Sequence, residues 1–315
     1  MKVGIVGAGL VGATAAYAIV MRKAASEVVL IDVNKKRADA EAADILHAVP
    51  FLNPVDVISG DYEDLRDCKV VVITAGVNQK QGESRIDLLG RNAAILKSIV
   101  PNIIKYAPKS ILLMATNPVD ILTQITADIA DSYGIHNSKV IGSGTTLDTA
   151  RFRSLLGTHL EIDSQHVHAF VIGEHGDSEV LTWSIADIGG IPLKEFARQR
   201  NILLDESIIS SIDDKVRNAA YKIIEGKGAT YYGIGSAISK LVEVITRDNK
   251  AILTVSSKTK NIEGIENVAI SLPRIISGNG IVDTLKLELS EMEKAELYRS
   301  AKSLKEFYDS YKTTN

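Results

Sequence analysis

The sequence predicts an α/β protein, with a doubly wound parallel sheet in its first half and an α+β arrangement with an antiparallel sheet in its second half. Three observations predict this fold. Short apolar runs alternate with helical segments up to about residue 142, and a glycine-rich turn follows the first run. Farther along the chain, strand-like runs instead follow one another across polar or glycine-rich turns. The first pattern is typical of a parallel sheet covered on both faces, and the second of antiparallel strands.

The expected strands of the first half are continuous apolar runs, as burial on both faces of a sheet requires. They cover residues 3–6, 28–31, 70–74, 111–115 and 140–141. The segments between them have helical spacing or are rich in alanine. These expected helices cover residues 10–22, 35–47, 85–106, 119–133 and 146–156.

The second half changes pattern after the last of these helices. Residues 166–172, 251–256 and 268–273 read as strands, and residues 206–225 and 232–245 as helices. Gly278-Asn279-Gly280 is a turn, and a long helix follows it, with Ser290 and Glu293 spaced as a capping box. We place the domain boundary near Gly142-Ser143-Gly144, which predicts domains of residues 1–143 and 144–315.

Composition excludes several classes of protein. The 315 residues are 45% hydrophobic and 24% charged, which is enough for large buried cores and argues against disorder. A net charge of −3 argues against a nucleic-acid binder. The single cysteine, Cys68, cannot form an internal disulfide, and we expect a thiol at the start of a buried strand. The first apolar run begins at Val3, and no run has membrane-spanning length, so the sequence predicts a cytoplasmic protein.

A dinucleotide site is predicted by glycines at the end of the first expected strand. Gly7, Gly9 and Gly12 form G-x-G-x-x-G, where the first glycine permits a tight turn, the second lets a pyrophosphate approach, and the third lets helix and strand pack closely. Asp32 ends the second expected strand, where a carboxylate binds ribose hydroxyls and repels a 2′-phosphate. Residues 1–143 are therefore predicted to be a Rossmann-type domain that binds NAD rather than NADP, and residues 144–315 an α+β catalytic domain.

Five polar residues have the chemistry that reduction of a 2-oxo acid requires. His175 lies between glycines after an expected strand and suits a proton donor. Asp148 would orient such an imidazole, and Arg151 would grip a carboxylate with two parallel hydrogen bonds. Arg85 would polarise the carbonyl group, and Asn117 follows an inner strand at its carboxyl end, where open α/β sheets bind ligands.

Each of these residues also has a simpler interpretation. His175 alone would be an ordinary turn histidine, and Arg85 a surface charge at a helix start. Asp148 and Arg151 are spaced as an i, i+3 surface pair worth a few tenths of a kcal/mol. Spacing alone does not decide between the two interpretations.

The order of four longer motifs favours the catalytic interpretation. They are Ala75-Gly76 through Arg91-Asn92, Thr116-Asn117-Pro118-Val119-Asp120, Gly142-Ser143-Gly144 through Arg151-Phe152-Arg153, and Gly173-Glu174-His175-Gly176-Asp177-Ser178. In these motifs and their order, the chain resembles the lactate and malate dehydrogenase family along essentially its whole length.

The resemblance implies a role for each residue. His175 would be the acid and base, Asp148 its partner and Arg151 the carboxylate clamp, with Arg85 on a loop that closes over the substrate. Asn117 would bond the substrate oxygen and help to position the nicotinamide, and a cis bond is expected between Asn117 and Pro118. Thr230 would line the substrate pocket. The resemblance also implies L-stereochemistry, no metal, and a homotetramer arranged as a dimer of dimers.

The residue at position 79 predicts the substrate. By the resemblance, malate dehydrogenases have arginine there, which neutralises the second carboxylate of oxaloacetate, whereas this chain has Gln79. An unpaired, desolvated carboxylate beside Gln79 would cost several kcal/mol, or orders of magnitude in rate. We therefore expect pyruvate and L-lactate as substrates. The adjacent Lys80 is expected to face solvent, because neighbours on an extended loop usually point apart.

A further pair of residues indicates regulation. Arg153 lies two positions after Arg151 and so on another side of the helix, and His168 precedes His175 by seven positions. From spacing alone they would be an exposed arginine and an ordinary strand histidine. However, the pattern resembles the bacterial members of the family that fructose 1,6-bisphosphate activates. Arg153 and His168 would then bind phosphate across a subunit interface.

Two other functions remain open. A malate dehydrogenase or a relaxed 2-hydroxy acid dehydrogenase would use the same catalytic residues, and Gln79 argues against the first. The other is a non-catalytic dinucleotide-binding protein with this fold. Such a protein would not need the combination of His175, Asp148, Arg151 and Arg85.

Overall fold

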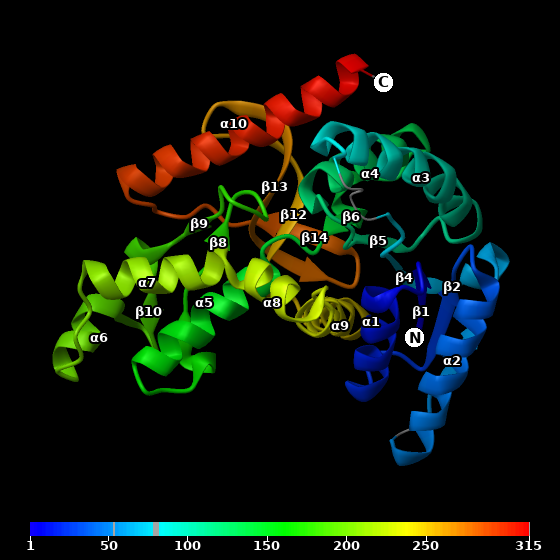
Figure 1. The fold of residues 1–315 in the computed structure, drawn as a ribbon, viewed down its shortest axis with the longest axis horizontal. Helices are drawn as coiled ribbons and strands as arrows, with labels where there is room; N and C mark the ends of the chain where they lie inside the picture. Colours follow the sequence, from blue (N-terminus) through cyan, green and yellow to red (C-terminus); the bar gives the residue numbers. More distant parts are fainter. Residues whose placement is uncertain (53, 78–81, 315) are drawn as a thin grey trace.

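The computed structural model describes residues 1–52, 54–77 and 82–314. Gln79 and Lys80 therefore lie outside the described residues. Within these ranges, nine strands form one sheet in the order β14-β13-β12-β6-β5-β4-β1-β2-β3. In Figure 1, the strands β12 to β14 (residues 251–284, orange) lie between the first half of the chain and the lobe of residues 146–227.

Six parallel strands form the first part of this sheet. They are β1 (Lys2–Val6), β2 (Glu27–Ile31), β3 (Asp56–Ser59), β4 (Cys68–Ile73), β5 (Ile111–Met114) and β6 (Val140–Gly142). Their order, 3-2-1-4-5-6, is that of a doubly wound dinucleotide-binding sheet, so the predicted fold class is confirmed. The sequence did not predict β3, because this edge strand is exposed at alternate positions and has no continuous apolar run.

Helices cover both faces of the sheet. One buried cluster packs under α1 (Leu10–Met21), α2 (Lys35–Ala48) and α9 (Tyr232–Arg247). The cluster on the opposite face packs under α3 (Arg85–Tyr106), α4 (Val119–Ser132) and α10 (Glu291–Thr314). Thus α9 and α10, from the second half, complete layers that begin in the first half, and α9 lies beside α1 in Figure 1.

The predicted antiparallel sheet is present, and it extends the parallel sheet. It contains β12 (Ala251–Ile262), β13 (Ile265–Ser277) and β14 (Gly280–Thr284), which pair in sequence order. A bridge between Ser256 and Gly142 joins β12 to β6. Cys68 is buried at the start of β4, as expected, and burial raises the pKa of its thiol to about 12.

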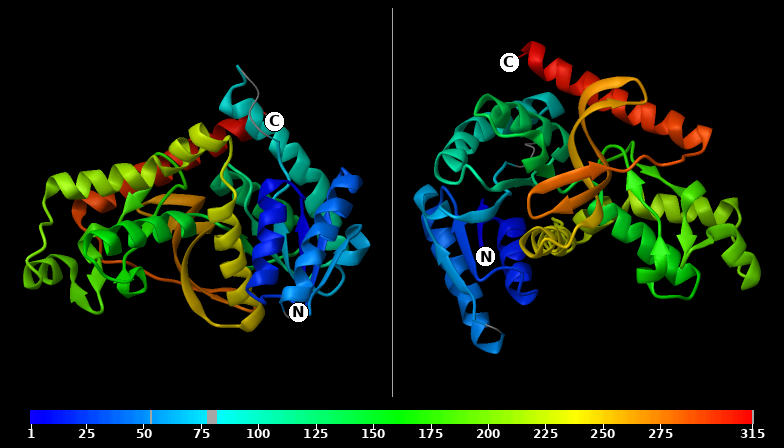
Figure 2. Two further views of the ribbon diagram at one scale, coloured as in Figure 1. Left: turned by 60° about the horizontal axis from the view of Figure 1, so that its bottom comes forward. Right: turned by 180° about the vertical axis from the view of Figure 1, so that it is seen from behind.

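The rest of the second half forms a smaller lobe, which Figure 2 shows from two further sides. It contains α5 (Thr146–His159), α6 (Leu193–Gln199), α7 (Glu206–Arg217) and α8 (Ala219–Lys227). Short strands accompany these helices: β7 (Val167–His168), β8 (Val171–Ile172), β9 (Val180–Leu181), β10 (Asp187–Ile188) and β11 (Ile191–Pro192). Phe152 and Trp183 meet edge to face in the core of this lobe, with ring centroids 4.7 Å apart.

Two elements of this lobe differ from the expected ones. The expected strand over residues 166–172 is divided into β7 and β8. The two strands have different partners, since β7 pairs with β10 whereas β8 pairs with β9. The helix expected over residues 206–225 is interrupted at Asn218, which ends α7 and precedes α8. Asparagine favours helix ends over helix interiors, which explains the position of the break. Among the described residues, no helix is long and apolar enough to cross a membrane.

Candidate active site

The three glycines of the first turn differ in what surrounds them. Gly7 has a φ of +108°, which favours glycine, and its backbone N–H donates to the Ile31 carbonyl at 2.7 Å. A Cβ on Gly12 would lie 1.8 Å from the Gly7 carbonyl oxygen, so helix and turn pack too closely for a side chain. A Cβ on Gly9 would have no described atom within 4 Å. Gly9 therefore faces open space at the start of α1, where the sequence predicted that a pyrophosphate approaches.

Asp32 closes this turn from the end of β2. Its Oδ2 accepts a hydrogen bond from the backbone N–H of Ala8 at 2.7 Å, and its Oδ1 accepts one from that of Asn34 at 2.8 Å. Each carboxylate oxygen has a further lone pair that can accept from a ribose hydroxyl. The turn, the start of α1, which has no side-chain cap, and Asp32 together fit an adenine dinucleotide.

His175 and Asp148 meet in the second half of the chain. The Nδ1 atom of His175 lies 2.6 Å from Oδ2 of Asp148, although 27 residues separate them in sequence. Asp148 lies in the first turn of α5 and is 2% exposed. Because Nδ1 faces the carboxylate, Nε2 is the ring nitrogen that remains for a ligand.

The contact between His175 and Asp148 also shifts the pKa of each group. Burial opposes protonation of His175, but the Asp148 carboxylate, with further contributions from Asp120 and Glu179, outweighs it and raises the pKa of His175 to about 9. Burial alone would raise the pKa of Asp148, whereas His175 and Arg151 hold it below its usual value. At neutral pH His175 is therefore a protonated imidazole beside the buried carboxylate of Asp148.

Arg151 lies on the other side of Asp148. Its Nη1 donates to Oδ1 of Asp148 at 2.7 Å, one helical turn along α5, and its side chain is 18% exposed. A guanidinium has five N–H donors, so Arg151 keeps others for a carboxylate ligand. The structure thus joins three predicted site residues through one buried carboxylate.

Asp120 is a residue of this site to which the sequence gave no role. It lies in the first turn of α4 and is 2% exposed, and its Oδ2 accepts the backbone N–H of His175 at 2.7 Å. Burial raises its pKa to about 6, against the opposing effect of these hydrogen bonds. A backbone bridge between Gly173 and Ser271 of β13 holds the start of the same turn. Asp120 immediately follows Asn117-Pro118-Val119, but spacing could not show that it contacts the histidine turn.

Arg85 lies at the start of α3, and its side chain is 78% exposed. Its Nη2 lies 3.7 Å from Oδ2 of Asp177, two residues after His175. The loop between β4 and α3 is attached at Val77, whose N–H donates to Asn92 of α3 at 2.9 Å. Arg85 is therefore close to the histidine turn, whereas Gln79, the predicted specificity residue, lies outside the described residues.

The remaining predicted substrate residues lie on connecting segments. The peptide bond between Asn117 and Pro118 is cis, which confirms the prediction, and the Asn117 side chain is exposed at the carboxyl end of β5. Thr230 is half-buried in the short connection between α8 and α9.

Arg153 and His168, the predicted regulatory pair, belong to neighbouring segments. Arg153 donates from Nε to the carbonyl of Ala169 at 2.8 Å, next to His168, and its guanidinium lies 5.3 Å from the Phe170 ring centroid. His168 is exposed, and its Nδ1 lies 3.1 Å from Oδ1 of Asp187. Arg153 therefore points away from the Asp148–Arg151 contact, as the helical spacing predicted.

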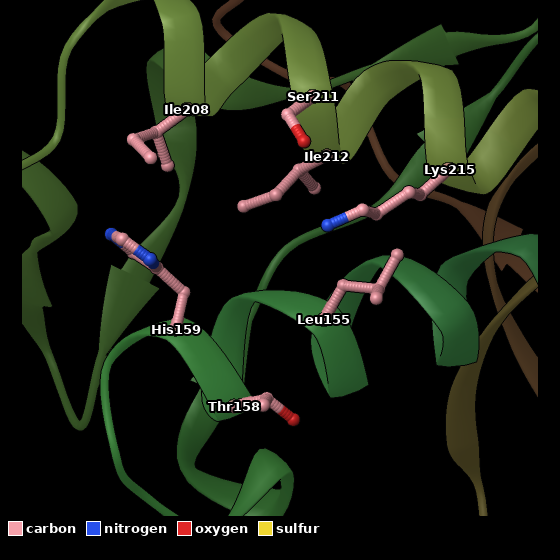
Figure 3. A pocket seen from close by; sticks show the side chains of 7 residues that line it. All are labelled: Leu155, Thr158, His159, Ile208, Ser211, Ile212 and Lys215. Atoms are coloured by element: carbon pink, nitrogen blue, oxygen red, sulfur yellow. The ribbon is translucent and has the colours of Figure 1, made fainter.

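A separate cavity of about 230 Å³ lies between α5 and α7 (Figure 3). Its lining combines apolar and polar side chains: Leu155, Thr158, His159, Ile208, Ser211, Ile212 and Lys215. None of these is a predicted site residue. Over the described ranges, no three His, Cys, Asp or Glu side chains are grouped so as to hold a metal ion.

Comparison with known proteins identifies the family of this chain. The sequence profile of the lactate/malate dehydrogenase NAD-binding domain matches residues 1–142, and that of the α/β C-terminal domain of the same family matches residues 145–314. An L-lactate dehydrogenase of Geotalea daltonii is 53% identical over 310 residues, which cover 98% of this chain and 99% of the relative. An L-lactate dehydrogenase of Thermus aquaticus is 53% identical over 305 residues, 97% of each chain.

Solved structures show the same similarity. A lactate dehydrogenase from a deep-sea metagenome library of the Medee basin superposes with a TM-score of 0.95, at 42% identity, over 99% of this chain and 98% of the other. A minor L-lactate dehydrogenase of Enterococcus mundtii superposes with a TM-score of 0.93, at 41% identity, over 98% of each chain. This chain is an NAD-dependent oxidoreductase that belongs to the lactate/malate dehydrogenase family.

Proposed function

We propose that this enzyme catalyses the reversible transfer of a hydride between NADH and pyruvate, giving L-lactate. The observation that carries the proposal is the contact of Asp148 with both His175 and Arg151, which joins a proton donor to a carboxylate clamp. The names of the relatives support the choice of pyruvate and L-lactate.

The residues divide the chemistry between them. NADH, held by the Gly7–Gly12 turn and Asp32, supplies the hydride. His175 holds a proton at Nε2 and gives it to the carbonyl oxygen as negative charge develops there. Asp148 fixes the imidazole and stabilises its protonated form.

The arginines and the pocket residues act on the substrate. Arg151 pairs with the substrate carboxylate, while its existing bond to Asp148 keeps the guanidinium in place. Arg85 moves with its loop toward the carbonyl oxygen and stabilises the developing charge, and closure excludes water. Asn117 bonds the substrate oxygen, Thr230 lines the pocket, and Gln79 leaves a second substrate carboxylate without a counter-charge.

Absorbance at 340 nm tests the proposal, with NADH and either pyruvate or oxaloacetate as substrate. The proposed function predicts a kcat/KM for pyruvate at least about tenfold above that for oxaloacetate, since one lost charge pair costs several kcal/mol. NAD should be reduced with L-lactate and not with D-lactate. A preference for oxaloacetate would instead identify a malate dehydrogenase.

We also propose that the enzyme is a homotetramer activated by fructose 1,6-bisphosphate. The position of Arg153 beside the segment that carries His168 supports a phosphate site there, and the exposure of His168 leaves it accessible. Donors from two subunits would clamp one bisphosphate, whose charge relieves their mutual repulsion. The activator would then favour the arrangement in which Arg151 is correctly placed, and lower the KM for pyruvate.

A further inference from the structure

Glu179 is a buried acid that the proposed chemistry does not use. It immediately precedes β9, four residues after His175, and is 4% exposed. Its backbone N–H donates to the Gly176 carbonyl at 3.1 Å, and its own carbonyl accepts from Nη1 of Arg217 at 2.6 Å. These bonds fix Glu179 at the end of the turn that carries His175.

Few interactions offset the burial of the Glu179 carboxyl group. Its Oε1 atom is buried, and no described residue makes a hydrogen bond to it. A buried polar atom without a partner is costly, and a buried carboxylate more so. Burial, with repulsion from Asp148, raises the pKa of Glu179 to about 8, although His175, Arg217 and Arg151 oppose the rise. The group is therefore mainly neutral at pH 7 and gains charge only in alkaline solution.

Charged groups from several elements surround this position. The charges that shift the pKa of Glu179 or of His175 belong to Asp148 and Arg151 of α5, Asp120 of α4, and Arg217 of α7. The pKa of Arg217 is raised by Asp213 of α7 and by Glu296 of α10. The pKa of Asp120 is raised by Glu174 of the histidine turn. Among these groups, Glu179 is the buried acid with an unpartnered carboxyl oxygen at the end of the histidine turn, and its negative charge raises the proton affinity of His175.

We propose that Glu179 is a further positioning residue of the reaction, whose buried carboxyl group keeps His175 protonated as the solution becomes alkaline. Loss of the Glu179 proton would place a second carboxylate near the imidazole, beside that of Asp148. The two groups then titrate as a pair, and His175 keeps its proton to a higher pH than Asp148 alone would allow. The inference rests on the proposed role of His175 as proton donor.

The first measurement is a histidine NMR titration of the free enzyme, with the His175 signal assigned from its absence in a His175→Asn variant. Glu179→Gln should lower the pKa of His175 by about half a unit or more, because the second carboxylate is gone. Glu179→Asp, which keeps a carboxyl group, should lie closer to the wild type. Glu296→Gln is the matched control, because it removes one nearby negative charge that acts on Arg217, and it should leave the titration unchanged.

The second measurement is the pH profile of kcat/KM for pyruvate. For Glu179→Gln, the loss relative to wild type should be at least about twofold larger at pH 9 than at pH 6.5, which a purely structural role does not predict. An unchanged His175 titration in both Glu179 variants, or an equal loss at the two pH values, would overturn the inference. If pyruvate is not a substrate but the titration shifts, the proposed function fails and the coupling stands.

Discussion

The Oδ2 atom of Asp148 lies 2.6 Å from the Nδ1 atom of His175, and this contact gives each nitrogen of the imidazole ring a separate role. Nδ1 stays with the buried carboxylate, so Nε2 is left for the substrate oxygen. The same carboxylate also accepts a bond from Arg151, so a change in His175 or in Arg151 acts on the other residue through Asp148.

The contact predicts how activity depends on pH. Pyruvate reduction requires protonated His175, whose pKa is raised above 6.5 to about 9. Because the pKa is raised, the active form is fully present at neutral pH and is lost as the pH rises through about 9. Lactate oxidation requires the neutral imidazole and should increase over the same interval. The measurement is kcat/KM in both directions from pH 6 to 10. A fall in reduction centred near pH 6.5 would show that Asp148 does not set the pKa of His175.

Arg85→Lys tests the loop arginine. Lysine keeps the positive charge but lacks the planar guanidinium group, whose several N–H donors can contact a carbonyl oxygen together. We expect kcat for pyruvate to fall by about tenfold or more, and NADH affinity, measured by fluorescence, to change much less. Arg37→Lys is the control, because Arg37 also lies 3.7 Å from a carboxylate, that of Glu41, but on α2. An unchanged kcat in Arg85→Lys would remove the role.

Gln79→Arg tests the specificity position. An arginine there supplies a counter-charge for the second carboxylate of oxaloacetate, so preference should shift from pyruvate toward oxaloacetate. The measurement is the ratio of kcat/KM for the two substrates. Lys80→Gln changes the charge of the neighbouring residue and should leave the ratio unaltered. If the ratio for Gln79→Arg stays within about tenfold of wild type, another residue selects the substrate.

Pyruvate saturation with and without fructose 1,6-bisphosphate tests the regulatory site. The activator should lower the KM for pyruvate in the wild type, and the double variant Arg153→Gln, His168→Gln should lose the response. An equal response in both proteins would place the effector elsewhere, and no response in the wild type would exclude the activation.

Local sequence patterns predicted most of the fold. Continuous apolar runs identified the five inner strands of the parallel sheet, and the helix of residues 85–106 was predicted with both of its ends. Several of the missed elements are too short to show a periodic pattern of their own. β9, β10 and β11 have two residues each and depend on their partners, and the break at Asn218 interrupts an otherwise continuous helical pattern.

The site was less accessible to sequence reasoning, because its contacts are long-range. Nothing in the spacing of Asp148 and His175 shows that they touch. Their chemistry suggested the pairing, and the family resemblance favoured it. Asp120 and Glu179 carry a weaker signal, since each is an acid beside apolar residues that become buried. The hydrogen bond from the His175 backbone to Asp120 and the burial of Glu179 arise only when the chain folds.

We propose that His175 gives the proton when this enzyme reduces pyruvate with NADH. The most direct test is single-turnover oxidation of NADH by pyruvate at pH 7, in the wild type and in His175→Asn, with NADH affinity measured in parallel. We expect rapid oxidation by the wild type, and a loss of at least about 100-fold in the variant with NADH affinity largely retained. A wild type that leaves NADH unoxidised with pyruvate would exclude pyruvate as the substrate, and a variant that oxidises NADH at a similar rate would exclude His175 as the proton donor.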